Sequence, residues 1–74
     1  MPHDVGFAVI GLGMGTQHCR SIESAVGAYL VAVCDEDEAR LQPIAEEYDC
    51  RPYENLDDLL EDDEVQVVCI ATPS

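Results

Sequence analysis

Lysine is absent from this 74-residue sequence, and its only basic residues are Arg20, Arg40 and Arg51. The 16 acidic residues outnumber them, so the formal net charge is −13 at pH 7. A surface that binds nucleic acid or an anionic membrane has to be basic, because it must neutralise phosphate groups. The composition therefore argues against nucleic acid and membrane surfaces as partners.

The acidic excess has two explanations, and the sequence leaves both open. A solvated acidic surface keeps a protein soluble through mutual repulsion. Alternatively, the protein is halophilic, since high salt screens such self-repulsion and makes it tolerable. Under the halophilic hypothesis the free energy of unfolding should rise with KCl concentration, and a flat or falling curve would remove it.

None of the four cysteines belongs to a C-x-x-C pair, and no cysteine–histidine cluster has the spacing of a zinc site. Cys34 and Cys69 lie inside apolar runs, which favours small buried side chains. We therefore predict free thiols, no metal site and no disulfide framework. Free thiols fit the reducing environment of the cytoplasm.

The sequence also lacks a leader-like start and a long hydrophobic run. Its first four residues, MPHD, include no lysine or arginine, and the apolar run that follows is interrupted by glycines. We therefore predict neither a signal peptide nor a membrane-spanning segment, and a cytoplasmic location.

What the sequence contains is an alternation of apolar runs with helix-like periodicity. Short apolar runs predict strands over 5–10, 29–34, 50–53 and 65–71. Three- and four-residue spacing predicts helices over 14–26, 38–48 and 56–61. This alternation predicts an α/β fold, a Rossmann-like parallel sheet with right-handed crossovers and the strand order 3-2-1-4.

Local signals set the expected ends of the helices. Gly27 is placed to end the first helix, where a left-handed residue is common. Asp35 or Asp37 can cap the second helix, and Asn55 can cap the third. Pro43 inside the second helix predicts a kink or a later start.

The last predicted strand, 65–71, is apolar on both faces although the strand order places it at the edge of the sheet. Edge strands are normally short, charged, bulged or covered. We therefore expect a neighbouring strand that these 74 residues do not contain, which makes the chain a partial domain truncated after its fourth strand. The alternative is an independent domain whose edge is covered by dimerisation.

Three glycines, Gly11, Gly13 and Gly15, fall where the first strand gives way to the first helix. A pyrophosphate binds at a helix N-terminus only where bare backbone allows a close approach. Gly11 would make the tight turn, and Gly13 would open room for the phosphates. The pattern G-x-G-x-x-G has its third glycine where this chain has Thr16, so we expect Gly15 to permit close packing of the helix on the sheet.

Asp35 ends the second strand, 22 positions after Gly13. An acid about 20 residues after the glycines accepts hydrogen bonds from the adenosine ribose hydroxyls. Acids follow Asp35 at positions 36, 37 and 38, and no Arg or Lys comes directly after it. The 2′-phosphate of NADP would therefore be repelled, so NAD is favoured over NADP. The alternative role for Asp35 is that of a plain helix cap.

The sequence resembles, over essentially its whole length, the N-terminal part of a Gfo/Idh/MocA-type oxidoreductase. The matching segments are AVIGLGMGTQH, VAVCDEDEAR and AEEYDCRPYENLDDLLEDDEVQVVCIATPS. His18 matches a histidine that often follows the glycines in this family, and we interpret it as a helix residue. The chain departs from the pattern at Thr16, where many members have glycine.

The resemblance implies that residues 1–74 are part of an NAD(P)-binding Rossmann domain of a dehydrogenase acting on a sugar, cyclitol or related polyol. The implied cofactor-binding residues are Gly11, Leu12, Gly13, Met14, Gly15 and Thr16 at the pyrophosphate, Asp35 at the ribose, and Ala71, Thr72, Pro73 and Ser74 toward the nicotinamide. The family's E-K-P segment, its Asp-x-x-x-His helix and its substrate domain would lie beyond Ser74, so we predict no catalytic residue within the chain. We also expect a small-molecule substrate for the parent protein and a homo-oligomer.

Two other functions deserve comparison. A non-catalytic, NAD-sensing regulator would keep the same fold and lack the downstream lysine and histidine. An S-adenosylmethionine methyltransferase also uses a glycine turn, but it expects an acid at the start of that turn, where this chain has Val9 and Ile10.

Overall fold

The computed structural model describes residues 4–71, with Met14 described by its backbone only. Strands and helices alternate along the chain. In order they are β1 (Val5–Ile10), α1 (Leu12–Ser24), β2 (Ala28–Cys34), α2 (Glu38–Tyr48), β3 (Arg51–Tyr53), α3 (Leu56–Leu60) and β4 (Val67–Ile70). The predicted alternation is confirmed, and α2 has its predicted bounds.

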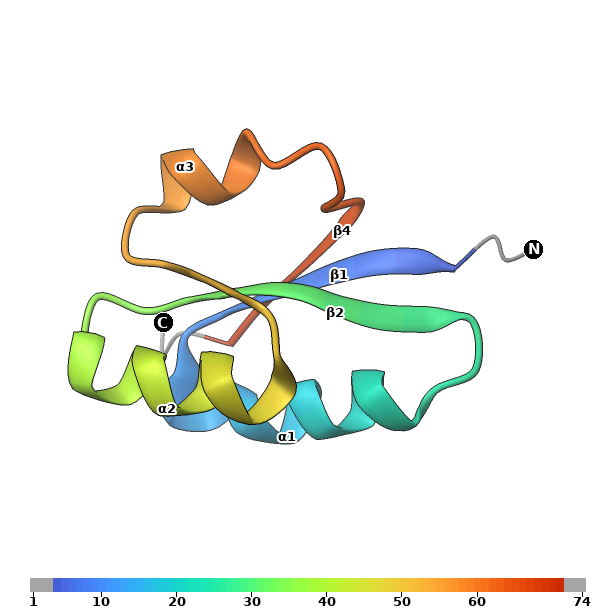
Figure 1. The fold of residues 1–74 in the computed structure, drawn as a ribbon, viewed down its shortest axis with the longest axis horizontal. Helices are drawn as coiled ribbons and strands as arrows, with labels where there is room; N and C mark the ends of the chain where they lie inside the picture. Colours follow the sequence, from blue (N-terminus) through green and yellow to red (C-terminus); the bar gives the residue numbers. More distant parts are fainter. Residues whose placement is uncertain (1–3, 72–74) are drawn as a thin grey trace.

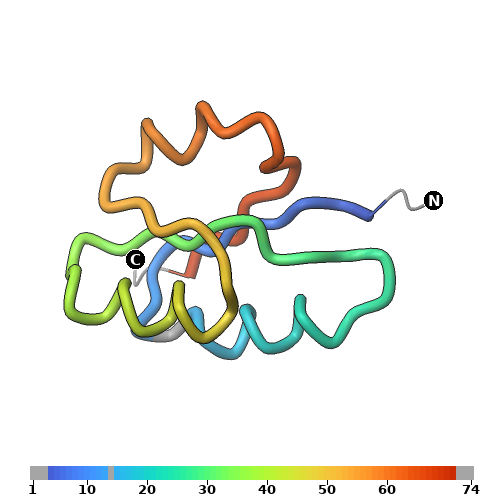
Figure 2. The backbone as a smooth tube through the Cα atoms, in the orientation of Figure 1, coloured from blue at the N-terminus to red at the C-terminus, as the bar shows by residue number. Residues whose placement is uncertain are grey.

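The strands form one parallel sheet in the order β3-β2-β1-β4, as predicted. Figure 1 shows α1 and α2 together on one face of this sheet and α3 on the other face. The backbone trace in Figure 2 shows the segment between β3 and β4 arching over that second face. Because β1 lies between β2 and β4, the carboxyl end of β1 is the point where the strand order reverses.

Each face of the sheet carries its own cluster of buried apolar side chains. The cluster beneath α1 and α2 consists of Val9, Leu12, Cys19, Ile22, Leu30, Val33, Leu41 and Ala45. The cluster beneath α3 consists of Ala8, Val31, Ala32, Cys34 and Leu59. The sheet is therefore buried on both faces along β1 and β2, as near-continuous apolar runs predict.

A bulge in the pairing of β1 with β2 accounts for two successive residues in the same cluster. Phe7 pairs with Leu30, but the next residue, Ala8, pairs with Ala32, which leaves Val31 as the extra residue. Val31 and Ala32 consequently both belong to the cluster on the α3 face. A continuous apolar run has no alternation that could reveal such a bulge.

Helix α1 begins and ends two residues earlier than predicted. Gly11 precedes it with φ 89°, so the turn takes a single residue and the helix starts at Leu12. The prediction that Gly27 ends the helix is wrong. Gly27 lies in the turn before β2 with φ 87°, and its carbonyl accepts a hydrogen bond from the amide of Val5. Val26, predicted to be the last residue of this helix, is outside it and fully exposed.

The second and third helices are capped by side chains. The carboxylate of Asp37 accepts a hydrogen bond from the amide of Ala39, and the side chain of Asn55 accepts one from the amide of Asp57. Of the two predicted caps for α2, the structure therefore selects Asp37. Pro43 lies inside α2, and the helix continues through it.

Strand β4 is shorter than predicted and forms an edge of the sheet. It pairs with β1 on one side, and Val67 and Ile70 are 38% and 71% exposed. The prediction that this apolar strand lies at an edge of the sheet is confirmed, and the further neighbouring strand stays a prediction. Leu56 and Leu60 of α3 are also exposed.

The four cysteines are free, with Cys19 and Cys34 buried and Cys50 and Cys69 partly buried. Burial raises the pKa of Cys19 to about 11 and that of Cys50 to about 12. Within residues 4–71 no group of three or more side chains is arranged to hold a metal ion. The helices of this part of the chain are too short or too polar to cross a membrane.

Gly6 fixes how the chain enters β4. Its carbonyl accepts a hydrogen bond from the amide of Gln66 at 2.8 Å, and its own amide donates to the side-chain oxygen of Gln66 at 2.9 Å. A Cβ atom at Gly6 would lie 2.1 Å from the backbone oxygen of Glu64. The close approach of these two backbone segments therefore requires glycine.

A cluster of charged and phenolic groups fixes the loop before β4 to β3. Arg51 donates two hydrogen bonds to the carboxylate of Asp62, at 2.9 and 2.7 Å, and also pairs with Glu64. The hydroxyl of Tyr53 donates to the same carboxylate at 2.8 Å. The Arg51 guanidinium lowers the pKa of Asp62 below its ordinary value of 3.8, together with the Glu64 amide and the Tyr53 hydroxyl.

Replacing Gly6 with alanine should destabilise the fold by about 3 kcal/mol or more, because backbone must move to accommodate the new methyl group. Urea unfolding measures the change. Gly13→Ala is the matched control, since its Cβ would meet only the flexible end of the Arg40 side chain. Equal unfolding free energies for the two variants would contradict this account of β4.

The Asp62→Asn variant should unfold at a lower urea concentration than the wild-type protein at pH 7. Because the pKa of Asp62 is lowered in the folded state, its stabilisation is present above about pH 3.8 and disappears as the pH falls through the folded-state pKa. The difference between the two proteins should therefore shrink in acid. The exposed neighbour Asp63, changed to Asn, controls for the loss of one negative charge and should show no such pH-dependent difference.

Candidate functional site

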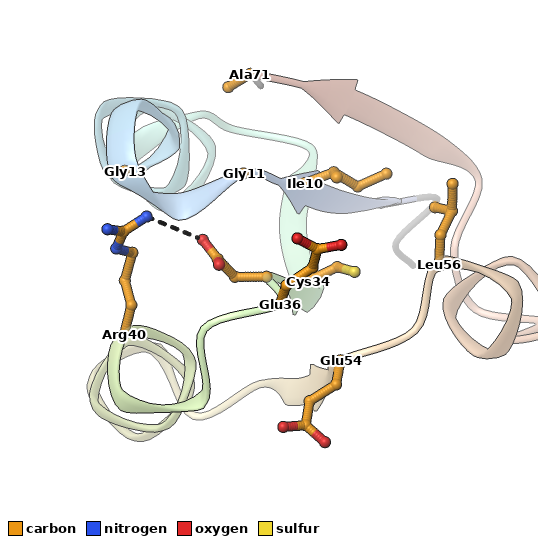
Figure 3. Close-up of a pocket in the computed structure, with 10 residues that line it drawn as sticks. Ile10, Gly11, Gly13, Cys34, Glu36, Arg40, Glu54, Leu56 and Ala71 are labelled. Atoms are coloured by element: carbon orange, nitrogen blue, oxygen red, sulfur yellow. Dashed lines mark ion pairs between the residues drawn. The ribbon is translucent and has the colours of Figure 1, made fainter. Parts of the chain in front are cut away.

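A cleft of about 430 Å³ opens at the carboxyl ends of β1 and β2. It lies where the strand order reverses, and in open α/β sheets this is where ligands bind. The residues that line it are Ile10, Gly11, Gly13, Cys34, Asp35, Glu36, Arg40, Glu54, Leu56 and Ala71. Figure 3 shows that they come from the ends of β1, β2 and β4, from α1 and α2, and from the start of α3 and the segment before it, with the Glu54 side chain pointing away from Glu36.

The glycine turn forms one wall of this cleft. Gly11 has a left-handed conformation that other residues adopt only with strain, and its amide donates to the carbonyl of Cys34 at 2.9 Å. Gly13, the second residue of α1, is exposed to the cleft. The first turn of a helix leaves amides without intrahelical acceptors, so this wall presents backbone donors.

Gly15 lies behind the turn, and a Cβ there would be 2.7 Å from a methyl group of Val9. Its lack of a side chain therefore lets α1 pack closely on β1. This is the role that the sequence analysis assigned to it, in place of a glycine at Thr16. The position of the third glycine can shift because close packing depends on which helix residue faces the strand.

Asp35 forms the opposite wall and joins two helices. One carboxylate oxygen accepts a hydrogen bond from the amide of Leu12, at the start of α1, and the other accepts one from the amide of Asp37, each at 2.8 Å. The side chain is 9% exposed, and Arg40 lies 3.5 Å away. Because Asp37 caps α2, the alternative role of Asp35 as the cap of that helix is wrong.

The contacts of Asp35 keep it ionised. Burial alone would raise its pKa, but the two amide hydrogen bonds and the Arg40 guanidinium outweigh burial, so the pKa is lowered below 3.8. A carboxylate has about four acceptor positions, and two are used by these amides. The remaining positions face Arg40 and the cleft.

The residues predicted to bind a cofactor do not all reach the cleft. Gly11, Gly13, Asp35 and Ala71 line it. Leu12 and Gly15 are buried beneath it, so Leu12 contributes its backbone to the site and its side chain to the core. Thr16, on the next turn of α1, does not line the cleft. Thr72, Pro73 and Ser74 lie outside the described residues, as does the side chain of Met14.

Sequence reasoning missed five lining residues, Ile10, Cys34, Arg40, Glu54 and Leu56, and it used Glu36 as an acid that would repel a 2′-phosphate. Ile10 and Cys34 are the last residues of β1 and β2, so the strand order alone could have placed them. Arg40, Glu54 and Leu56 come from elements that fold back toward the cleft, and no spacing rule reveals them. His18 is exposed on α1 and does not line the cleft, which agrees with its interpretation as a helix residue.

The arrangement combines two chemical functions across one cleft. Bare backbone at a helix N-terminus can hold an anionic group, because the amides and the helix dipole both favour negative charge. An ionised, partly buried carboxylate can accept hydrogen bonds from hydroxyl groups. A ligand that spans the cleft would therefore carry a phosphate-like anion and a polyhydroxylated group.

Comparison with known proteins extends this result. Residues 5–74 match the model of the oxidoreductase family with an NAD-binding Rossmann fold named for Gfo, Idh and MocA. A 2,7-anhydro-N-acetylneuraminate hydratase of Mediterraneibacter gnavus is 39% identical over 95% of this chain and 18% of its own length. An inositol 2-dehydrogenase of Rubrobacter xylanophilus is 38% identical over 93% of this chain and 20% of its own length.

Among solved structures, GenD2 from gentamicin A biosynthesis, in complex with NAD, superposes with a TM-score of 0.93 at 35% identity. The match covers all of this chain and 22% of GenD2. The chain thus spans about a fifth of the length of the relatives that it matches. The sequence match and the shared fold together establish that the chain belongs to the Gfo/Idh/MocA family of oxidoreductases.

Proposed function

We propose that this chain is the NAD-binding segment of a dehydrogenase that acts on a sugar, a cyclitol or a related polyol. The observation that carries the proposal is the juxtaposition of the glycine turn with the ionised Asp35 across the cleft. These two groups match the two polar parts of a dinucleotide, the pyrophosphate and the adenosine ribose.

In the proposed complex the pyrophosphate lies against the backbone of Gly11 and Gly13. Among the side chains that the structure describes, a Cβ atom at Gly13 would meet the movable end of Arg40. The ribose hydroxyls donate to Asp35, whose hydrogen bonds to Leu12 and Asp37 fix its orientation. Ala71 also lines the cleft, and we propose that it contacts the cofactor toward the nicotinamide together with Thr72, Pro73 and Ser74.

We propose NAD as the preferred cofactor. Asp35, the proposed partner of the ribose, lines the cleft together with Glu36 and Glu54, so the cleft carries three carboxylates. A 2′-phosphate on that ribose would meet their repulsion, whereas the free hydroxyl of NAD would donate a hydrogen bond to Asp35.

The bound nicotinamide supplies hydride transfer, and the residues of this chain bind and orient it. The chain spans about a fifth of the length of the curated relatives that it matches. We therefore propose that the acid–base residues and the substrate domain belong to a longer parent protein. The relatives named for inositol and for an anhydro sugar acid support a polyol substrate.

The regulatory alternative has no supporting observation in the part of the chain that the structure describes. The homo-oligomer and the cytoplasmic location stay predictions.

The Gly13→Ala variant tests the proposed cofactor site. We expect the protein to bind NAD in a calorimetric titration and the variant to bind it at least about tenfold more weakly, a factor that corresponds to roughly 1.4 kcal/mol. The new methyl group would stand where the pyrophosphate must approach the backbone. Urea unfolding should show that the variant keeps its stability, because alanine is favourable inside a helix.

Two results would contradict the proposed function. One is the absence of any heat of binding with NAD and with ADP-ribose, which contains both recognised groups. The other is an unchanged affinity for NAD in a correctly folded Gly13→Ala protein.

A further inference from the structure

The amino half of β2 has a strand on one side only. β1 pairs with β2 from Ala28 onward, but β3 pairs only with Ala32–Cys34. Among the residues that the structure describes, no strand therefore pairs with the outer side of residues 28–31. Figure 1 shows this half of β2 extending toward the turn after α1, beyond the part that β3 reaches. An unpaired strand edge presents main-chain donors and acceptors and can template another strand.

The edge stays open because of the way the chain leaves α2. Asp49, which ends that helix, has a left-handed conformation with φ 52°. Its amide donates to the carbonyl of Glu46, and the amide of Cys50 donates to the carbonyl of Ala45. These hydrogen bonds hold the chain against the end of α2 until it joins the sheet at Arg51. The place that a longer β3 would occupy beside residues 28–31 is thereby left empty of strand.

A cavity of about 340 Å³ lies along this open edge. The residues that line it are Tyr29, Leu30, Val31, Asp49, Cys50, Arg51 and Glu64. The side chains of Leu30 and Val31 are buried in the apolar clusters on opposite faces of the sheet. These two residues therefore offer mainly their main chain to the cavity. The cavity lies toward the amino end of β2, whereas the proposed cofactor site lies at its carboxyl end.

The charge around the cavity is predominantly negative. The carboxylates of Asp49 and Glu64 line it, and the one lining cation among the described residues, Arg51, is already paired with Asp62 and Glu64. Burial and the neighbouring Glu64 carboxylate raise the pKa of the Tyr29 hydroxyl. The whole chain carries a formal charge of −13, so a second copy would be repelled from this edge. A cationic segment would be attracted to it.

We propose that residues 28–31 of β2 form a docking edge for an extended, lysine- or arginine-rich segment of a partner protein. The segment adds a strand beside β2, in line with β3, and its main-chain groups bond to the docking edge. The edge is about 13 Å long, at about 3.3 Å per residue, so about four residues of the partner pair with it. The partner's basic side chains lie near Asp49 and Glu64, and the ring of Tyr29, which is 37% exposed, can contact them.

A titration with the end-blocked hexapeptide KVKVKV, followed by the amide NMR signals of the 74-residue chain, tests the docking edge. We expect the signals of Tyr29, Leu30 and Val31 to shift and their amide hydrogens to exchange more slowly, because main-chain groups there gain partners. The acidic peptide EVEVEV should not bind. A KVKVKV peptide with alternate amides N-methylated should bind at least about tenfold more weakly, because it keeps the charge but lacks the donors.

Two variants and a salt series test the part that charge contributes. Asp49→Asn should weaken binding of KVKVKV about threefold, and asparagine tolerates the left-handed conformation that this turn requires. Asp57→Asn removes the same charge from α3, outside the cavity, and should leave the affinity unchanged. Raising KCl from about 50 to about 500 mM should weaken binding about tenfold, because salt screens exposed charges. Urea unfolding of each variant verifies its fold.

Three outcomes would overturn the docking edge. The first is no binding of KVKVKV at low salt. The second is equal affinity for the N-methylated peptide, which would reduce the effect to general attraction between opposite charges. The third is a set of signal shifts confined to β4, the other strand with an unpaired side. Each of these results leaves the proposed NAD site standing, because NAD binding is measured separately and at the other end of β2.

Discussion

The carboxylate of Asp35 holds together the parts of the molecule on which the cleft depends. It accepts one hydrogen bond from the first amide of α1 and one from the turn that leads into α2. A single side chain at the end of β2 therefore fixes the starts of both helices on the same face of the sheet. The same carboxylate remains accessible from the cleft, so the group that organises the fold is also the group offered to a ligand.

This arrangement explains why the glycine turn tolerates an irregular spacing. The start of α1 is set by the left-handed Gly11 and by the hydrogen bond from Leu12 to Asp35. Once that start is fixed, the helix needs a missing side chain wherever it meets Val9, and this position is Gly15. Thr16 lies elsewhere on the helix, so it need not be glycine. The spacing of the glycines follows from which residue of α1 faces β1, so the spacing alone does not define the site.

Most of the architecture was predictable, because each buried strand is a continuous apolar run and each helix has a cap or a periodic face. The ends of α1 were misplaced because Leu12 looks like part of a loop until Asp35 is known to accept its amide proton. The bulge at Val31 was not predicted, because a continuous apolar run has no polar–apolar alternation that a bulge would interrupt. The place of Arg40 was not predicted. The turns at Asp35 and Asp37 bring this residue, five positions after Asp35, back beside the end of β2.

The distribution of charge connects these features. Two of the chain's three arginines form ion pairs in the structure, Arg40 with Asp35 and Arg51 with Asp62 and Glu64. The pairs lie at opposite ends of the sheet, and the two arginines differ in how fully their donors are bonded. Arg51 is surrounded by acceptors that satisfy it and fix the loop before β4. Arg40 pairs with Asp35, which two backbone amides already stabilise, and its side chain lines the cleft. Arg40 is half-exposed beside a carboxylate that two backbone amides already stabilise, so its ion pair contributes little to the stability of the fold.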